Sequence, residues 1–269
     1  MSTTRNEITT LVIGDAHDAP EASQERFEAL GNLIEAVRPT NIVQIGDWGS
    51  YDSVSFHNKG RPLLQEGRRL ADDLASAKAA YGLAFGPLKR YINRQRSNKK
   101  RVVAPNVYWL EANHEYRIKR FLMENPVLVG MLPETDLVGA SLDGATIVPW
   151  REYCYINGVA FTHIPFAKRS SSPIGGEFVT KRAAEFHDTT VVFGHTHRFL
   201  VHDNARIRER SSPLVHAINV GWFGDYIPSY IEAEVNMDWW PGLVMLHHTD
   251  YGRVDIETIG MAQIKEAYL

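Results

Sequence analysis

The sequence predicts a mixed α/β fold in which two packed, partly mixed β-sheets are flanked by helices. Two observations lead to this prediction. Residues 9–45 read as strand, helix and strand, which is the pattern of a βαβ unit. From about residue 146 onward the chain reads mainly as short strands. One half that alternates strand and helix, followed by a strand-rich half, indicates two sheets with helices on the outside.

The predicted βαβ unit begins with a β-branched run, Thr9–Ile13, which ends at Gly14-Asp15. Glu21–Arg38 follows, with apolar residues at helical spacing. Asn41–Ile45 is a second apolar run that ends at Gly46-Asp47. Both predicted strands therefore end in a glycine and an acid, where the chain turns away from the sheet.

A helical insertion is predicted at about residues 60–101, because apolar residues recur there every three to four positions. Gly86-Pro87 is a point at which this helix could break. After the insertion, Asn106–Leu110 returns to strand and Glu115–Met123 reads as helix. No domain boundary is evident, so we expect a single domain over residues 1–269.

The remaining predicted strands are short. They are Thr146–Pro149, Glu152–Ile156, Val159–Thr162, Thr190–Phe193, Leu214–Val220, Leu243–His248 and Arg253–Thr258. Asn157-Gly158 predicts a tight hairpin turn between the second and third of them.

The composition is that of an ordinary globular protein, with 44% hydrophobic and 23% charged residues. The net charge of −3 argues against a chain that coats nucleic acid or an anionic membrane. The single Cys154 excludes an intrachain disulfide and favours a reducing compartment. No apolar stretch approaches the roughly 18–20 residues of a membrane span, and the first ten residues lack the apolar core of a signal peptide. We therefore expect a cytoplasmic protein without a membrane partner.

Side chains that bind metals or transfer protons follow the predicted strands. They form five segments: Asp15-Ala16-His17, Gly46-Asp47, Asn113-His114-Glu115, His163 and Gly194-His195-Thr196-His197. Taken singly, each residue fits a structural histidine or a turn-forming Asp or Asn equally well. Seven of them, Asp15, His17, Asp47, Asn113, His163, His195 and His197, supply oxygen and nitrogen donors and no thiolate, a set that suits Mn, Fe, Zn, Ni or Mg. Seven donors exceed one tetrahedral site but suit two ions that share a bridging carboxylate.

The order of these segments resembles that of the calcineurin-like metallophosphoesterase family, whose pattern runs D-x-H, GD, GNH[DE], H and GHxH. The segments span residues 15–197, about two thirds of the chain. The resemblance implies a four-layer αββα sandwich of two mixed sheets flanked by helices. A weaker likeness, over SFHNKG and EGRRLADDLASAK, is to phosphoesterases carried by bacteriophages.

The resemblance also implies two divalent metal ions, of which manganese is the first expectation. It assigns Asp15, His17 and His197 to one ion, Asn113, His163 and His195 to the other, and Asp47 to the bridge between them. The nucleophile would be a hydroxide that bridges the ions. His114 would protonate the leaving oxygen, a general-acid role that contributes typically about 10²–10⁴-fold. Asp47 and His114 are therefore the expected catalytic residues.

Three departures from the family pattern stand out. Ala112 replaces the usual glycine before Asn113, which is tolerable if the φ angle of Ala112 is negative. Ser50 stands where many relatives have an Asp that orients the catalytic histidine, and Asp52 could take over that task. No arginine stands beside the second segment, Gly46-Asp47, although the protein phosphatases of the family use an arginine there to hold phosphate.

Four residues are expected to bind substrate: Asn113, His57, Lys168 and Arg169. The last two lie in the loop after His163, from which basic side chains could reach the site. A run with seven basic and no acidic residues, Lys89 to Arg101, fits either a guide for a nucleic-acid backbone or a solvated helix end.

The missing arginine and the basic run favour a phosphodiesterase that acts on nucleic acids, as a nuclease, or on nucleotides. A phosphomonoesterase that acts on small-molecule or protein phosphates is the alternative. A third hypothesis is a non-catalytic scaffold with the same fold, but such relatives typically lose ligands or the catalytic histidine. This chain keeps them all. The sequence leaves the oligomeric state open.

Overall fold

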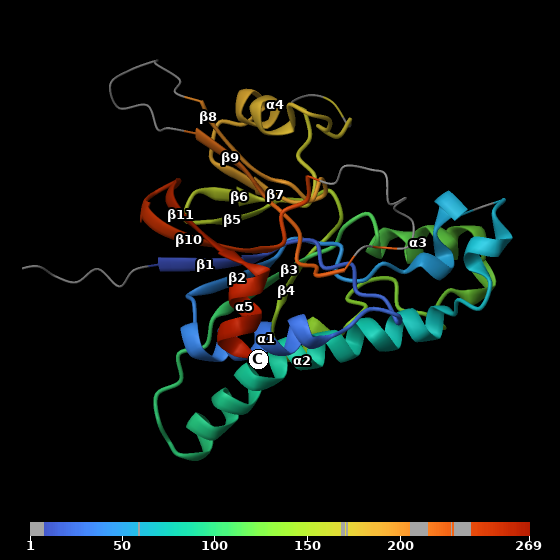
Figure 1. Ribbon diagram of the computed structural model, residues 1–269, viewed down its shortest axis with the longest axis horizontal. Coiled ribbons are helices and arrows are strands. Elements are labelled where there is room, and N and C mark those ends of the chain that lie inside the picture. The colour runs from blue at the N-terminus through green and yellow to red at the C-terminus, as the bar shows by residue number, and fades with distance from the viewer. Residues whose placement is uncertain are drawn as a thin grey trace, which may run out of the picture.

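Two β-sheets stacked face to face form the centre of the protein, and helices cover the outer face of each sheet (Figure 1). The computed structural model describes residues 8–58, 60–167, 170, 172–204, 215–226, 228 and 238–269. Both sheets contain parallel and antiparallel pairs. The predicted αββα sandwich of two mixed sheets is therefore confirmed.

The first sheet has six strands in the order β11-β10-β1-β2-β3-β4. The strands are β1 (Ile8–Ile13), β2 (Asn41–Gln44), β3 (Asn106–Leu110), β4 (Thr146–Val148), β10 (Gly242–Asp250) and β11 (Arg253–Gly260). β1 to β4 are parallel, whereas β10 runs antiparallel to both β1 and β11. The carboxyl ends of β1, β2 and β3 therefore lie at one edge of the sheet.

The second sheet has five strands in the order β5-β6-β7-β9-β8. They are β5 (Cys154–Ile156), β6 (Val159–Phe161), β7 (Val191–Phe193), β8 (Phe199–Asn204) and β9 (Val215–Val220). β6, β7 and β9 are parallel, and the outer strands β5 and β8 are antiparallel to their neighbours. The carboxyl ends of the three central strands again point the same way.

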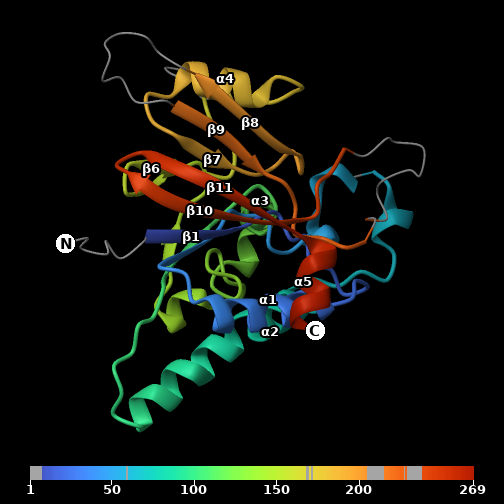
Figure 2. The ribbon, with the colours of Figure 1, turned by 60° about the vertical axis from the view of Figure 1, so that its left-hand side comes forward.

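Helices α1 (Glu25–Val37), α2 (Leu70–Ser97) and α5 (Met261–Tyr268) lie against the first sheet, and α4 (Val179–Phe186) lies against the second (Figure 2). α3 (Glu115–Glu124) follows β3. The 3₁₀ turns are η1 (Asp52–Val54), η2 (Phe56–Asn58), η3 (Pro62–Gln65), η4 (Pro126–Leu128) and η5 (Ala140–Asp143). No helix in the described part of the chain is both long and apolar enough to cross a membrane.

Three layers of apolar side chains separate the four layers of backbone. In β1, Leu11 and Ile13 pack toward the helices α1 and α2, while Val12 packs between the sheets. This alternation follows from the period of two along a strand. A third apolar layer, which includes Val191 of β7 and Ala183 of α4, joins the second sheet to its helix. Because both sheets are covered on both faces, their central strands are continuous apolar runs.

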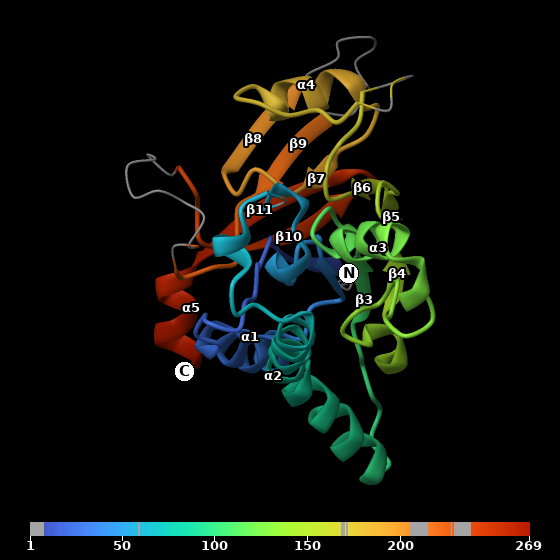
Figure 3. The same cartoon turned by 90° about the vertical axis from the view of Figure 1, so that its right-hand side faces the viewer.

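The loops that follow the parallel strands of both sheets meet on one side of the molecule, which faces the viewer in Figure 3. The segment that carries η1, η2 and η3 lies on this side as well, and η1 contacts both α2 and α3. This side of the protein therefore gathers the polar segments that the sequence places after the strands.

The predicted strands match the observed ones to within a few residues, including Asn106–Leu110 at its exact bounds. The sequence reasoning missed β8, α4 and α5. A break of the long helix at Pro87 does not occur, since α2 continues through this residue. Pro87 leaves the carbonyl of Leu83 without its usual helical partner, but the neighbouring helix α1 packs closely against this turn at Gly31.

Replacing Gly31 by alanine is expected to destabilise the protein by about 1–3 kcal/mol, the usual cost of overpacking. A Cβ at Gly31 would lie 2.3 Å from the carbonyl oxygen of Leu83 and 2.9 Å from Cγ of Pro87. The matched control is Gly82→Ala on α2, where a Cβ meets nothing within 4 Å. Alanine at this position should raise the free energy of unfolding by about 0.5–1 kcal/mol. Urea unfolding measures both. Unchanged stability of Gly31→Ala would contradict the close helix contact.

Candidate functional site

The strand-end loops bring the seven predicted metal ligands and His114 into one cluster, which is buried except at the partly exposed Asn113 and His195. Three groups within it could each hold a metal ion, because their ligand atoms lie within 4.8 Å of one another. The groups are Asp15, His17 and His197; His17, Asp47 and His114; and Asp47, His163 and His195. Asp47 and His17 each belong to two groups, so the cluster is continuous.

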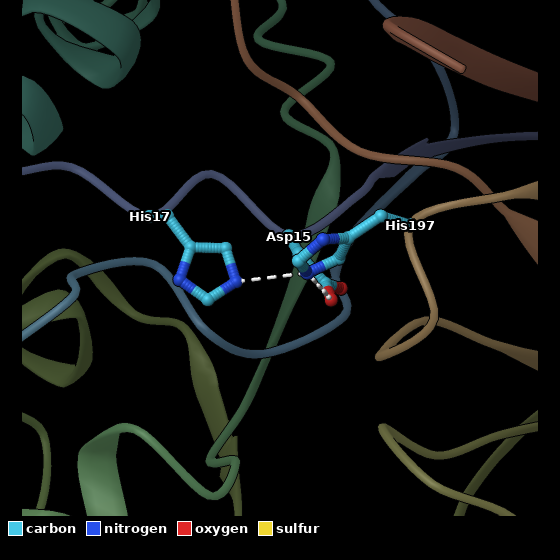
Figure 4. A group of neighbouring side chains, drawn as sticks. All are labelled: Asp15, His17 and His197. Atoms are coloured by element: carbon cyan, nitrogen blue, oxygen red, sulfur yellow. Dashed lines mark hydrogen bonds and ion pairs between the residues drawn. The ribbon is translucent and has the colours of Figure 1, made fainter. Parts of the chain in front are cut away.

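The first group joins the loop after β1 to the loop after β7 (Figure 4). Nε2 of His197 lies 3.1 Å from Oδ2 of Asp15 and 3.0 Å from Nε2 of His17. Two imidazole nitrogens at this distance cannot both carry a proton. Within the described part of the chain, Oδ1 of Asp15 and Nδ1 of His17 are buried without a hydrogen-bond partner. Buried polar atoms are rarely left unsatisfied, so the group has the features of a cation site.

The third group, Asp47, His163 and His195, joins the loops after β2, β6 and β7, and Asn113 in the loop after β3 lies beside it. Oδ2 of Asp47 lies 3.2 Å from Nε2 of His163 and 3.7 Å from Nε2 of His17, so this carboxylate reaches both groups. Oδ1 of Asn113 lies 2.9 Å from Nε2 of His163. The ring of His195 packs edge-on against that of His163, with the centroids 5.3 Å apart.

The spacing and chemistry of these atoms fit two divalent metal ions. Ligand atoms that each lie about 2.0–2.2 Å from one metal are roughly 3.0–3.5 Å apart, close to the separations observed here. Burial lowers the pKa of His17 and of His195, which favours the neutral rings that metals require. Burial also disfavours a charge on His163, but Asp47 and Asp15 outweigh it and raise its pKa to about 9. The two carboxylates thus create a place that favours a positive charge.

Four of the cluster residues adopt a left-handed backbone conformation. The φ angles are 46° at His17, 52° at Asp47, 73° at His195 and 60° at His197. Asp and His enter this region more readily than most residues, yet such conformations cost of order 1–3 kcal/mol each and concentrate at functional sites. The backbone of these loops is therefore shaped to point several side chains at one place.

Glu115 ties two of the loops together. Its carboxylate accepts hydrogen bonds from the backbone N–H groups of Trp48 (2.8 Å), Asp47 (3.1 Å) and Ala112 (3.0 Å). Ala112 does not have a positive φ, so the alanine is tolerated as expected. Gly46 has a φ of 110°, and a Cβ there would lie 2.4 Å from Cβ of Ala112.

His114 is 7% exposed and is held at both ring nitrogens. Nδ1 lies 2.9 Å from the backbone oxygen of Ser50, which can only accept, so Nδ1 donates. Nε2 lies 3.0 Å from Nη2 of Arg117, which can only donate, so Nε2 accepts. Burial lowers the pKa of His114 to about 3. The carboxylate of Asp47 acts to raise this pKa, and the positive charge of Arg117 acts to lower it further. An acid role therefore requires that His114 gain a proton when a phosphate binds.

A pocket of about 520 Å³ opens above the cluster. Its floor is formed by the cluster residues His17, Asp47, Asn113, His114, His195 and His197. Its wall is formed by the segment that carries η1, η2 and η3 together with Arg117 of α3. The site therefore combines a ligand-rich floor with a wall that carries three arginines, Arg61, Arg68 and Arg117.

Two of the four predicted substrate-binding residues, Asn113 and His57, line this pocket. Lys168 and Arg169 lie outside the described residues. The basic run from Lys89 to Arg101 begins in the last turns of α2, whose end lies away from the loops after β1, β2 and β3 (Figures 1 and 2). Within the described chain, none of its residues lines the pocket.

The sequence reasoning missed the three arginines of the wall. Arg117 had a usable signal, because it stands three residues after His114 on a predicted helix and residues at this spacing are neighbours. Asp52 does not contact His114 directly. It accepts a hydrogen bond from Arg117 (2.8 Å) and lies 3.4 Å from Nη1 of Arg68. The backbone oxygen of Ser50, and not its side chain, takes the position beside the ring.

Comparison with known proteins agrees with this geometry. The model of the calcineurin-like phosphoesterase family matches residues 8–199, which is more than half of the chain and includes all the cluster residues. No curated protein matches the chain. The family match and the buried aspartate and histidine groups lead to the same conclusion: the chain belongs to the calcineurin-like phosphoesterase family.

Proposed function

We propose that the protein is a two-metal phosphodiesterase that cleaves nucleic acids or nucleotide diesters, as a nuclease or a nucleotide phosphodiesterase. Membership of the family implies a metal-dependent hydrolase of phosphate esters. The diester preference goes beyond that and depends on the pocket. We also propose that it works in the cytoplasm, which the single cysteine supports.

In this proposal the seven strand-end residues hold two divalent ions, with manganese as the first choice. Asp15, His17 and His197 hold one ion, Asn113, His163 and His195 hold the other, and Asp47 bridges them. The position of Oδ2 of Asp47 between His163 and His17 supports the bridge. When bound, such ions supply the hydroxide nucleophile and neutralise charge on the phosphate.

His114 is proposed to protonate the leaving oxygen from Nε2. This atom faces the pocket floor, 3.9 Å from Oδ2 of Asp47. The backbone oxygen of Ser50 fixes the ring by accepting the Nδ1 proton. The negative charge of a bound phosphate would favour a second proton at Nε2, which is then available to the departing alkoxide.

The size of the pocket carries the preference for a diester. The pocket continues beyond the cluster to His57, Asn58, Arg61 and Leu64, which leaves room for more than a phosphate group. A second ester group of the substrate could occupy this space. The sequence favoured a diester because an arginine was missing and because of the basic run from Lys89 to Arg101. Neither reason holds, since arginines line the pocket and no residue of the described basic run does.

A phosphomonoesterase is the second candidate, and one observation favours it. Arg117 lies beside His114, where a guanidinium could bind the extra charge of a monoester. The non-catalytic scaffold has less support, because the potential ligands and His114 are all present and clustered.

Parallel assays after manganese loading test the proposal. We expect hydrolysis of bis-p-nitrophenyl phosphate and of single- or double-stranded DNA to exceed hydrolysis of p-nitrophenyl phosphate. Strong monoesterase activity without diesterase activity would replace the first candidate by the second. A protein that holds less than one metal per chain and hydrolyses none of these substrates would be a scaffold.

A further inference from the structure

We infer that Arg117 forms the anion-binding side of the site and contacts the phosphoryl oxygens beside His114. Ser50 and Asp52 are positioning residues that hold its guanidinium in place. The inference rests on the proposed function, since it concerns the same site. It assigns a role to a residue that lies outside the five strand-end segments.

The guanidinium of Arg117 is fixed at one end. Nη1 donates to the backbone oxygen of Ser50 at 2.6 Å and to Oδ1 of Asp52 at 2.8 Å. These two bonds use both hydrogens of Nη1. The other carboxylate oxygen of Asp52 lies 3.4 Å from Nη1 of Arg68, so Asp52 itself is held from two sides. Arg117 is therefore preorganised before any substrate arrives.

The other end of the guanidinium faces the pocket. Nη2 lies 3.0 Å from Nε2 of His114, the atom proposed to face the leaving oxygen. An oxygen that accepts a hydrogen bond from protonated Nε2 of His114 lies about 2.7–3.2 Å from it, and on the Arg117 side of the ring it can also accept from Nη2, which then no longer donates to Nε2. Nη2 also keeps a second hydrogen that the bond to His114 does not use. The side chain of Arg117 is 15% exposed and lines the pocket.

In many relatives an aspartate orients the catalytic histidine, and here two groups, the backbone of Ser50 and the side chain of Arg117, contact that ring instead. The backbone oxygen of Ser50 orients His114 through Nδ1. Arg117 adds a positive charge that does not depend on pH, since a guanidinium stays protonated in proteins. Its remaining Nη2 hydrogen can donate to a non-bridging oxygen of a phosphate ester while Nη1 stays bonded to Ser50 and Asp52. The expected ligand of Arg117 is thus the phosphoryl anion itself, in a monoester, a diester or inorganic phosphate.

Binding of inorganic phosphate to the manganese-loaded protein, measured by calorimetry, tests the inference independently of turnover. We expect Arg117→Ala to weaken phosphate binding by at least about 10-fold and to lower kcat by about 10²–10³-fold, as for other donors to a developing charge. Metal content should stay unchanged. Guanidinium ion added at millimolar concentration should restore part of the activity of Arg117→Ala, and Arg117→Lys should retain only part because lysine lacks the planar fork.

The matched control is Arg120→Ala, which removes an exposed arginine of the same helix that lies over the Phe56 ring and outside the pocket. It should bind phosphate like the parent protein. Asp52→Asn should weaken phosphate binding less than Arg117→Ala and respond to no added guanidinium.

Phosphate binding by Arg117→Ala at the parent level would overturn the inference, as would loss of metal from both Arg117 variants, because Arg117 would then be structural. A parent protein that binds phosphate through Arg117 but hydrolyses no ester would support the inference and contradict the proposed function.

Discussion

Replacing Asp47 by asparagine should abolish most activity and remove metal from the protein. Asp47 supplies the only carboxylate oxygen that lies within 4 Å of both His163 and His17 among the described residues. Asparagine tolerates the left-handed backbone that Asp47 adopts, so the loop should keep its shape while the bridging charge is lost. The loss of activity should exceed the roughly 10–100-fold that mutation of an outer-shell partner costs.

Metal analysis by mass spectrometry after manganese loading, together with turnover of bis-p-nitrophenyl phosphate, measures this effect. The matched control is Asp255→Asn, which removes an exposed carboxylate of β11. It should hold two ions and keep parent activity. An Asp47→Asn protein that still holds two ions would show that Asp47 is not the bridge.

His114→Ala should keep both metal ions and lose most turnover of substrates with a poor leaving group. A general acid contributes about 10²–10⁴-fold when the leaving oxygen needs a proton, and an alkoxide needs one more than p-nitrophenolate does. The loss should therefore be much larger for an alkyl ester or DNA than for bis-p-nitrophenyl phosphate. Steady-state kinetics on both classes of substrate give two ratios, each the kcat of the parent protein divided by that of the variant.

His202→Ala serves as the control, because it removes a histidine of β8 outside the cluster. It should leave both ratios unchanged. Equal losses for the two leaving groups in His114→Ala would indicate that this residue stabilises the phosphoryl group instead of donating a proton. Unchanged turnover would remove His114 from the reaction.

The strand-end segments could be predicted because their signals are local. A buried strand is an apolar run, and the polar residue that follows it must lie at the sheet edge. Asp15, Asp47 and His163 stand in such places in the sequence and in the fold. The helix α4 was missed because it is only eight residues long, and the strand β8 because its three apolar residues are consecutive and do not alternate with the polar ones. Their structure depends on contacts with the second sheet.

The wall of the pocket could not be predicted for a different reason. The contact between Asp52 and Arg117 joins a 3₁₀ turn to a helix more than 60 residues away. It depends on how the irregular segment after β2 packs against α3, and hydrophobic periodicity predicts helices and strands but not the course of such a segment. The sequence showed that Ser50 stands where the family has an aspartate. It could not show that the backbone oxygen of Ser50 accepts the hydrogen bond from His114.

Each proposed ion takes its ligands from loops of both sheets. The first set combines Asp15 and His17 after β1 with His197 after β7, and the second set is divided in the same way. During synthesis, the ribosome releases the first half of the chain long before His195 and His197 appear. A growing chain can therefore close neither site, and metal uptake must follow the docking of the two sheets. Metal bound between the docked sheets would stabilise the folded protein, so removal of the metal is expected to lower its stability as well as its catalytic activity.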